Sequence, residues 1–238
     1  NQDDKPADSS RRDILKGALG TGALAVGVAS VPDLIFPALA QGEKLVPFTD
    51  VPDTFNVRPV QANKTHFLDT REITTHFTDN DDFYLVQHYG QPEINNDSYK
   101  LKVTGMVDNE LEFSLSELMA RDNIEQQVGF ECGGNSQRRF HGLIGNALWR
   151  GVSLANILSE AGIQDGAKEI VFFGVDTQVE TIRETEVEKA FARSLSIDDA
   201  MRPENMLAFE MNGEPLPHYH GKPVRALIPG WYGVANVK

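Results

Sequence analysis

The chain alternates short strand-like runs with short helices, and turn residues bound each run. None of its helical patterns is long enough for the crossover helices that a parallel βαβ sheet requires. Two helices are predicted to start at serine caps, Ser114 with Glu117 three residues later, and Ser153. Asn212-Gly213 after an apolar run predicts a tight hairpin. The pattern therefore predicts an α+β domain that is mostly β, with strands within 82–88, 99–107, 124–131, 169–174, 206–211 and 224–230, and a turn and short helix over 191–200.

Three successive segments differ in composition. Residues 1–40 contain SRRDILK at 10–16, a weakly apolar run, and the small-residue triplet ALA at 38–40, in the order of a twin-arginine export signal. A short amphipathic helix of a cytosolic domain is the alternative, but it does not account for that order. Residues 41–80, spaced by proline and aspartate, are predicted to form an N-terminal extended arm, and residues 81–238 the main domain. Export by this route predicts a periplasmic protein.

The chain is acidic, with 35 aspartates and glutamates against 22 lysines and arginines and a formal net charge of −13. Such a balance repels nucleic acid and anionic lipid. After residue 41, no apolar run reaches the roughly 18 residues that a membrane-spanning helix needs. We therefore expect neither nucleic acid nor a membrane among its partners.

The only cysteine, Cys132, lies in the stretch FECGGNSQRRF at 130–140. A lone cysteine cannot form an internal disulfide, and free cysteine is most often a small buried apolar residue. Here, however, the sequence GGN follows it, which is typical of a loop that lets backbone approach a ligand. Arg138 and Arg139 would favour the thiolate. The thiolate could then be a nucleophile, a redox sensor or a soft metal ligand.

From residue 220 onward, basic residues and glycines are interspersed in the sequence. The runs HGKPVR, from His220 to Arg225, and GWYGVANVK, ending at Lys238, combine an imidazole, a guanidinium and an ammonium with flexible backbone. Taken singly, His220 is as often a structural histidine, and Arg225 or Lys238 is ordinary surface charge. Taken together, on an acidic chain, they predict a pocket for a phosphate or pyrophosphate group.

Three motifs resemble the sulfite oxidase family of molybdenum enzymes: FECGGNSQRR at 130–139, MNGEPLPHYHGKPVR at 211–225 and PGWYGVANVK at 229–238. They occur in the family's order, and the resemblance runs from about residue 81 to the end. It implies a sulfite oxidase-like molybdopterin-binding domain, with molybdenum–molybdopterin as cofactor and Cys132 as the single protein ligand of the metal. A thiolate suits a metal already held by dithiolene sulfurs. The resemblance also implies a pterin site formed by His88, Asp176, His220, Arg225, Asn236 and Lys238.

The family's reaction implies two-electron oxidation of sulfite or a related sulfur compound. Its electrons would pass one at a time to a c-type cytochrome, since the chain shows no C-x-x-C-H haem motif of its own. Arg138 and Arg193 are the cations expected to hold an oxyanion substrate beside Cys132. Members of the family usually continue into a C-terminal domain through which they dimerise. That domain is apparently missing from this sequence, but the resemblance still implies a possible homodimer formed through it.

The sequence departs from the family pattern near the expected substrate. Val86-Gln87 stand where the family has arginine and asparagine, Phe191 stands where it has tyrosine, and the arginine pair is displaced to Arg138-Arg139. A dianionic substrate needs a full set of cations. These departures favour protein-bound or other sulfur as substrate, or the reverse reaction, a reduction of sulfoxides or other oxo compounds.

Two further functions are compatible with the residues alone. A hydrolase would use Cys132 as nucleophile with His141 or His220 as base, although no third, orienting residue stands out. A binding module would keep the fold without a cofactor. The intact set of cysteine, histidine, arginine and lysine argues for the cofactor.

Overall fold

A computed structural model of the chain describes residues 65–70, 73–136 and 141–238. The export signal predicted at 1–40, most of the arm predicted at 41–80, and Arg138 lie outside these residues. Within them, no helix is both long enough and apolar enough to cross a membrane.

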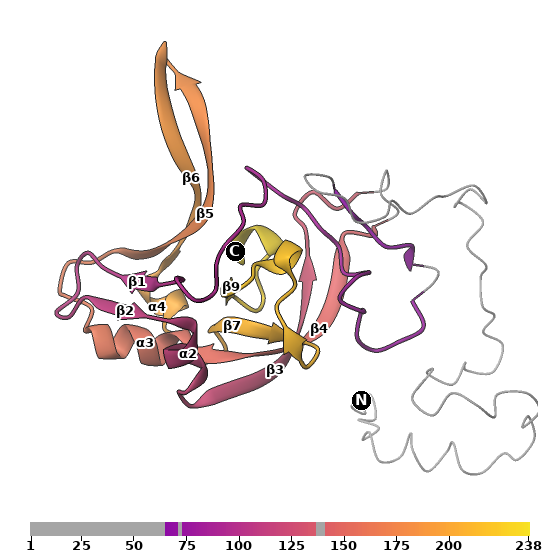
Figure 1. The fold of residues 1–238 in the computed structure, drawn as a ribbon, viewed down its shortest axis with the longest axis horizontal. Helices are drawn as coiled ribbons and strands as arrows, with labels where there is room; N and C mark the ends of the chain where they lie inside the picture. The colour runs from indigo at the N-terminus through magenta and orange to yellow at the C-terminus, as the bar shows by residue number, and fades with distance from the viewer. Residues whose placement is uncertain (1–64, 71–72, 137–140) are drawn as a thin grey trace, which may run out of the picture. The chain divides into compact units, whose positions relative to one another are not determined.

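Strands dominate the described elements, which confirms the predicted mostly-β α+β class (Figure 1). The strands are β1 (Leu101–Val103), β2 (Leu111–Phe113), β3 (Asn123–Glu131), β4 (Ile144–Ser153), β5 (Glu169–Ile182), β6 (Thr185–Ser196), β7 (Met206–Met211), β8 (Glu214–Pro215) and β9 (Arg225–Leu227). The helices are α2 (Leu115–Met119), α3 (Leu154–Ala161) and α4 (Ile197–Ala200), with 3-10 turns η3 (His218–His220) and η4 (Gly233–Ala235).

A five-stranded antiparallel sheet forms the centre of the domain. Its order is β3-β4-β7-β8, and β9 pairs with β7. The strand β7 lies between two cores because its side chains alternate: Met206 and Ala208 join one core, while Leu207 and Phe209 join the other. The pairs β1–β2 and β5–β6 form separate two-stranded sheets.

The first core is aromatic and supports the region that forms the candidate site. Phe130 of β3 stacks on Trp149 of β4 with ring centroids 5.0 Å apart, and Phe83 packs edge-on against both. Gly145 of β4 makes this possible, because a Cβ there would lie 2.6 Å from the Phe83 ring. The missing side chain lets the segment after Phe83 lie directly on the sheet.

Local signals in the sequence fix several element boundaries. The capping box of Ser114 and Glu117 starts α2, and the Ser153 side chain caps α3, both as predicted. Asn212 and Gly213, with φ of 54° and 80°, form the predicted tight turn between β7 and β8. These signals succeed because each involves residues close in sequence.

Three predictions of elements were wrong. Residues 82–88 bury Phe83, Tyr84 and Leu85 but expose Val86 and form no regular strand, and His66 and Leu85 make only an isolated bridge. The segment is held by side-chain packing instead of a ladder of hydrogen bonds. The strand predicted at 169–174 runs on to Ile182, and the turn predicted after Phe191 is the end of β6. Figure 1 shows β5 and β6 as a long hairpin that projects away from the central sheet.

Candidate functional site

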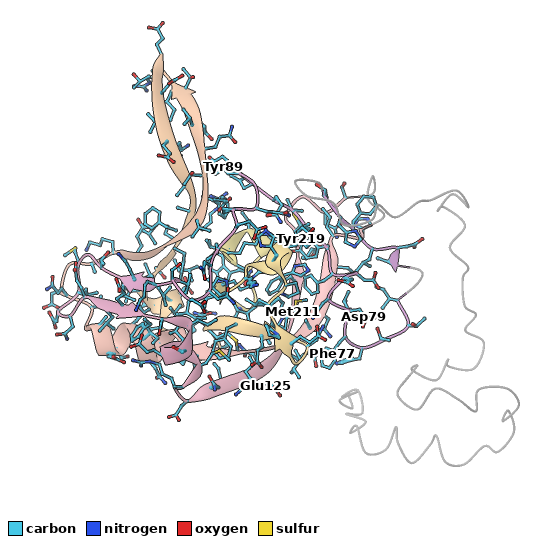
Figure 2. The ribbon with its side chains drawn as sticks, in the orientation of Figure 1. Phe77, Asp79, Tyr89, Glu125, Met211 and Tyr219 are labelled. Atoms are coloured by element: carbon cyan, nitrogen blue, oxygen red, sulfur yellow. The ribbon has the colours of Figure 1, made fainter. Side chains whose placement is uncertain are left out.

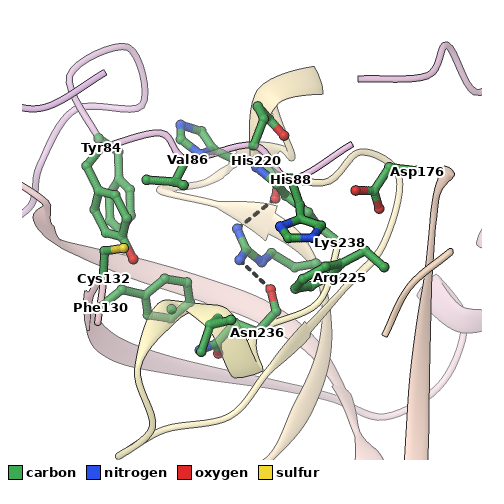
Figure 3. A pocket seen from close by; sticks show the side chains of 15 residues that line it. Tyr84, Val86, His88, Phe130, Cys132, Asp176, His220, Arg225, Asn236 and Lys238 are labelled. Atoms are coloured by element: carbon green, nitrogen blue, oxygen red, sulfur yellow. Dashed lines mark hydrogen bonds between the residues drawn. The ribbon is translucent and has the colours of Figure 1, made fainter. Parts of the chain in front are cut away.

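A cavity of about 150 Å³ lies between the aromatic core, the foot of the β5–β6 hairpin and the C-terminal segment (Figure 3). Residues far apart in the sequence meet there. Cys132 and all the residues predicted for the pterin site line it, namely His88, Asp176, His220, Arg225, Asn236 and Lys238.

Cys132 follows directly on β3 and is partly exposed. Its loop is held by Asn135, whose side chain accepts from the amide of Leu143 at 3.1 Å and donates to the carbonyl of His141 at 2.9 Å. The backbone amide of Gly134 donates to the Cys132 Sγ over 3.4 Å. The loop thus presents one sulfur to the cavity from a fixed backbone. Among the described residues, no three His, Cys, Asp or Glu side chains come together as a metal-binding cluster.

Arg225 is buried in the wall of the cavity. Its Nη1 donates to the carbonyl of His220 and its Nη2 to the carbonyl of Asn236, both at 2.8 Å, as the dashed lines in Figure 3 show. Its guanidinium lies 5.1 Å from the centre of the Phe130 ring. Burial lowers the pKa of Arg225 to about 10, so it is still a cation at neutral pH.

His220 is also buried, but it contributes no charge. Its Nε2 lies 3.1 Å from the carbonyl oxygen of Asn80, so Nε2 carries the proton and donates it. Burial, with Arg225 and Lys238 nearby, lowers the pKa of His220 to about 3. The ring is therefore neutral at neutral pH, and it lines the cavity without adding a positive charge.

Lys238 and Asp176 lie on the side of the cavity nearest the hairpin. The Nζ of Lys238 donates to the carbonyl of Tyr219 at 2.8 Å. Burial and the neighbouring Arg225 lower the pKa of Lys238 to about 7, because two positive charges share a poorly solvated place. One Asp176 oxygen accepts from the Tyr89 amide at 3.1 Å, which fixes its direction.

The side chain of Asn236 holds the C-terminal segment in place. Its Oδ1 accepts from the amide of Ile228 at 2.6 Å, and its Nδ2 donates to the carbonyl of Tyr232 at 3.1 Å. The carbonyl of Asn236 in turn accepts from Arg225. Asn236 therefore positions the guanidinium as much as it lines the cavity.

The remaining predicted site residues differ in their placement. His88 is exposed at the rim, with its ring 4.8 Å from that of Phe191. Arg193 is exposed on β6; its guanidinium lies over the Phe191 ring at 4.4 Å, and it does not line the cavity. Arg193 is therefore not one of the residues that line the cavity, where it was expected to replace a lost cation.

Several cavity residues were not predicted from the sequence. Tyr84, Phe130 and Val234 line the cavity, as do Val86 and Phe191, which were noted only as departures from a pattern. Tyr84 and Phe130 sit in apolar runs and look like ordinary core residues, so only their places in three dimensions separate them from the core. Gly233 was one signal in the sequence that could have indicated this part of the cavity, because a glycine often marks a place where another group approaches the backbone closely.

The charge balance of the cavity fits an anionic group. Among the described residues, no carboxylate forms an ion pair with Arg225 or Lys238. The buried Nε of Arg225 also has no hydrogen-bond partner within them, and a buried donor of this kind normally has one. Arg225 and Lys238 would hold a phosphate-bearing pterin, and the soft sulfur of Cys132 would bind its metal.

The cavity combines one cysteine sulfur with a buried cationic pocket, which together with the fold indicates a class of cofactor-dependent oxidoreductases. Comparison with known proteins identifies that class. Residues 88–238 match the family model described as oxidoreductase molybdopterin binding domain. The chain is 31% identical to mitochondrial sulfite oxidase of Drosophila melanogaster over 68% of its length and 30% of the relative's. It is 32% identical to the Homo sapiens enzyme, over 68% of this chain and 32% of that one.

One solved structure and one relative of another type extend the comparison. The sulfane dehydrogenase SoxCD from Paracoccus pantotrophus has the same fold, with a TM-score of 0.65 and 24% identity over 87% of this chain and 54% of that one. Nitrate reductase [NADPH] of Fusarium oxysporum is 28% identical over 68% of this chain and 19% of the relative. The chain thus spans about a third of the length of the sulfite oxidases named here.

The chain belongs to the sulfite oxidase family of molybdopterin-binding oxidoreductases. Its cofactor is molybdenum–molybdopterin, which supplies two-electron redox chemistry when bound. The protein residues that would hold it are Cys132 for the metal and Arg225 and Lys238 for the anionic pterin, all of which line the cavity.

Proposed function

We propose that the protein is a molybdenum oxidoreductase that oxidises sulfite or a related sulfur compound by two electrons. The single observation that carries the proposal is the cavity lined by the lone Cys132 and by Arg225 and Lys238, which form no ion pair with a carboxylate among the described residues. A thiolate at one wall and cations at another are what a metal attached to an anionic organic group requires. We infer a sulfur compound as substrate from the names of the similar proteins, the sulfite oxidases and the sulfane dehydrogenase.

Metal analysis and a cysteine variant test this proposal together. Protein isolated from a host that makes the cofactor should contain one molybdenum per chain. Cys132→Ser should retain the pterin, which Arg225 and Lys238 hold, but lose the metal's protein ligand. We expect oxidation of sulfur substrates by this variant to fall at least about 100-fold. Wild-type protein without molybdenum would contradict the proposal.

His141→Asn is the matched control, because it also separates the redox function from a hydrolase. His141 is exposed and has φ of 55°, a conformation that asparagine tolerates. Under the redox proposal this variant keeps wild-type activity and molybdenum content. A hydrolytic activity that disappears in both Cys132→Ser and His141→Asn would favour the cysteine hydrolase instead.

A second candidate, the reduction of sulfoxides or other oxo compounds, is favoured by the apolar part of the cavity. Val86, Phe191 and Val234 form that part, and Arg193 is not among the residues that line the cavity. Such a wall accepts an uncharged, partly apolar substrate better than a small dianion. Assays with an oxidised cytochrome and a sulfur compound, against a reduced dye and a sulfoxide, distinguish the two directions.

The proposal includes a c-type cytochrome as acceptor, a homodimer, and export to the periplasm. The support for export is the SRRDILK pattern at 10–16 followed by an apolar run. Replacing Arg11 and Arg12 by lysine in the full-length protein should leave it in the cytoplasmic fraction. Export of that variant at the wild-type level would contradict the twin-arginine route.

A further inference from the structure

Tyr84 occupies an unusual place for a core aromatic residue. Its ring stacks on Phe83 with centroids 5.4 Å apart and planes inclined by 22°, so it belongs to the aromatic core. The residue is only 8% exposed, yet it lines the cavity together with Cys132. The core therefore fixes the ring, while the ring's outer edge is turned to the cavity.

The hydroxyl of Tyr84 lies against Gly233. A Cβ at position 233 would collide with the Tyr84 hydroxyl oxygen, whereas it would lie 3.4 Å from the ring carbon Cζ. Only the oxygen therefore requires a glycine there. Among the described residues the hydroxyl is not one of the buried polar atoms that lack a partner, and Tyr84 lines the cavity, so the hydroxyl is available to a group bound there.

The hydroxyl can act as a hydrogen-bond donor at the cavity. A phenol has an ordinary pKa of about 10 and therefore keeps its proton at neutral pH. Tyr84 and Cys132 both line the cavity, and in the view of Figure 3 the Tyr84 oxygen is drawn next to the sulfur of Cys132.

We propose that the Tyr84 hydroxyl is a catalytic hydrogen-bond donor to an oxygen atom of the substrate or of the metal's ligand sphere, and that Gly233 is glycine to leave room for it. The proposal rests on the proposed function, because the metal bound by Cys132 brings that oxygen within reach. No bond to Tyr84 forms or breaks, and the phenol keeps its proton throughout. The hydroxyl would be held in place before the reaction and would stabilise the negative charge that develops on that oxygen. Because the donor is already in position, no reorganisation is needed during the reaction.

Tyr84→Phe tests the donor directly, because it removes one oxygen and keeps the ring in the core. The variant should retain molybdenum and its melting temperature, while kcat falls on the order of 100-fold. The electron paramagnetic resonance spectrum of the partly reduced metal should change its coupling to exchangeable protons. A purely structural tyrosine would shift melting temperature and leave that spectrum alone. Molybdenum-loaded Tyr84→Phe with wild-type kcat and spectrum would overturn the donor role.

A double-mutant cycle with Gly233→Ala tests the reason for the glycine. Gly233→Ala alone should lower both the melting temperature and kcat, because the new methyl group collides with the hydroxyl. In the Tyr84→Phe background the collision is absent, so the melting temperature should return while kcat stays low. Equal destabilisation in both backgrounds would overturn the assignment of Gly233.

The cycle also separates this inference from the proposed function. The melting temperatures can be measured on cofactor-free protein and do not depend on the metal. Wild-type protein without molybdenum would overturn the proposed function and the donor role with it. A loaded wild type with an unresponsive Tyr84→Phe variant overturns the donor role alone.

Discussion

The central-sheet core and the β5–β6 hairpin use similar apolar residues with opposite results. Phe83 in the core is 1% exposed, whereas Phe173 in β5 is 71% exposed. The central sheet has a core on each of its faces, so apolar side chains on both sides of a strand are covered. The hairpin has two strands only, and Ile170 and Phe172 alone on β5 pack against the second core. The number of covering layers, rather than strand hydrophobicity, decides burial here.

Charged residues differ between the same two regions. Lys238 in the cavity has a lowered pKa because it is buried beside another cation. Lys189 on the hairpin has a raised pKa because its Nζ donates to a carboxylate oxygen of Glu180 at 2.9 Å, in a pair that is half-exposed. Among the described residues the cations of the cavity form no ion pair, as in a binding site, whereas Lys189 on the hairpin is neutralised by Glu180.

The two regions meet at the foot of the hairpin. Asp176 and Phe191 of the hairpin line the cavity, and Tyr89 joins them to the segment of His88. The Tyr89 hydroxyl donates to Glu180 at 2.5 Å, and Figure 2 shows Tyr89 beside the hairpin. Part of the hairpin thus belongs to the site, although its outer half is exposed.

The sharpest test of the comparison is a matched pair of phenylalanine substitutions. Phe83→Ala should lower the free energy of unfolding by about 3–5 kcal/mol, because it leaves a cavity in the aromatic core. Phe173→Ala should change it by no more than about 0.5 kcal/mol, because its side chain is already in solvent. Urea unfolding of cofactor-free protein measures both, and equal losses would show that the hairpin is packed against something.

The cavity lysine predicts a pH dependence that the hairpin lysine does not. The folded-state pKa of Lys238, about 7, lies below its ordinary value of 10.5, so the unfolded chain binds more protons between these pH values. Stability of the cofactor-free protein should therefore rise with pH across this window. His220, with a pKa of about 3, and Arg225, with one of about 10, titrate outside most of it.

Melting temperatures measured from pH 7 upward check this slope. Lys238→Met should flatten it, and bound cofactor should flatten it too, because an anion stabilises the protonated lysine. Lys189→Met is the matched control and should leave the rise in place. A slope that persists unchanged in Lys238→Met would assign it to another group.

The smallest effect is expected where the two regions join. Tyr89→Phe removes the hydrogen bond to Glu180 but keeps the amide bond from Tyr89 to Asp176. Because the lost hydrogen bond is only partly buried and lies on the hairpin, global melting should hardly change, while amide exchange at the foot of β5 should speed up. Unaltered exchange there would mean that the backbone contact to Asp176 is sufficient to hold the hairpin.

Prediction from sequence was reliable where the signal was contiguous. The Ser114 capping box, the Asn212-Gly213 turn and the three cofactor motifs each consist of neighbouring residues, and the fold class and family followed from them. It was poor at the hairpin, because the apolar run at 169–174 is typical of both buried and exposed strands. Tyr84 escaped notice for a similar reason, since nothing next to it in the sequence is catalytic.

The sequence by itself determined the family, the helix caps, the turns, and the residue types that face the cofactor. Only the tertiary structure decided that His220 is neutral, that Arg193 does not line the cavity, and that the Tyr84 hydroxyl lies against Gly233 in the cavity that Cys132 also lines. The physical reason is that caps and turns depend on backbone geometry over a few residues. Proton affinity, burial and the reach of a side chain depend instead on what distant segments bring alongside it.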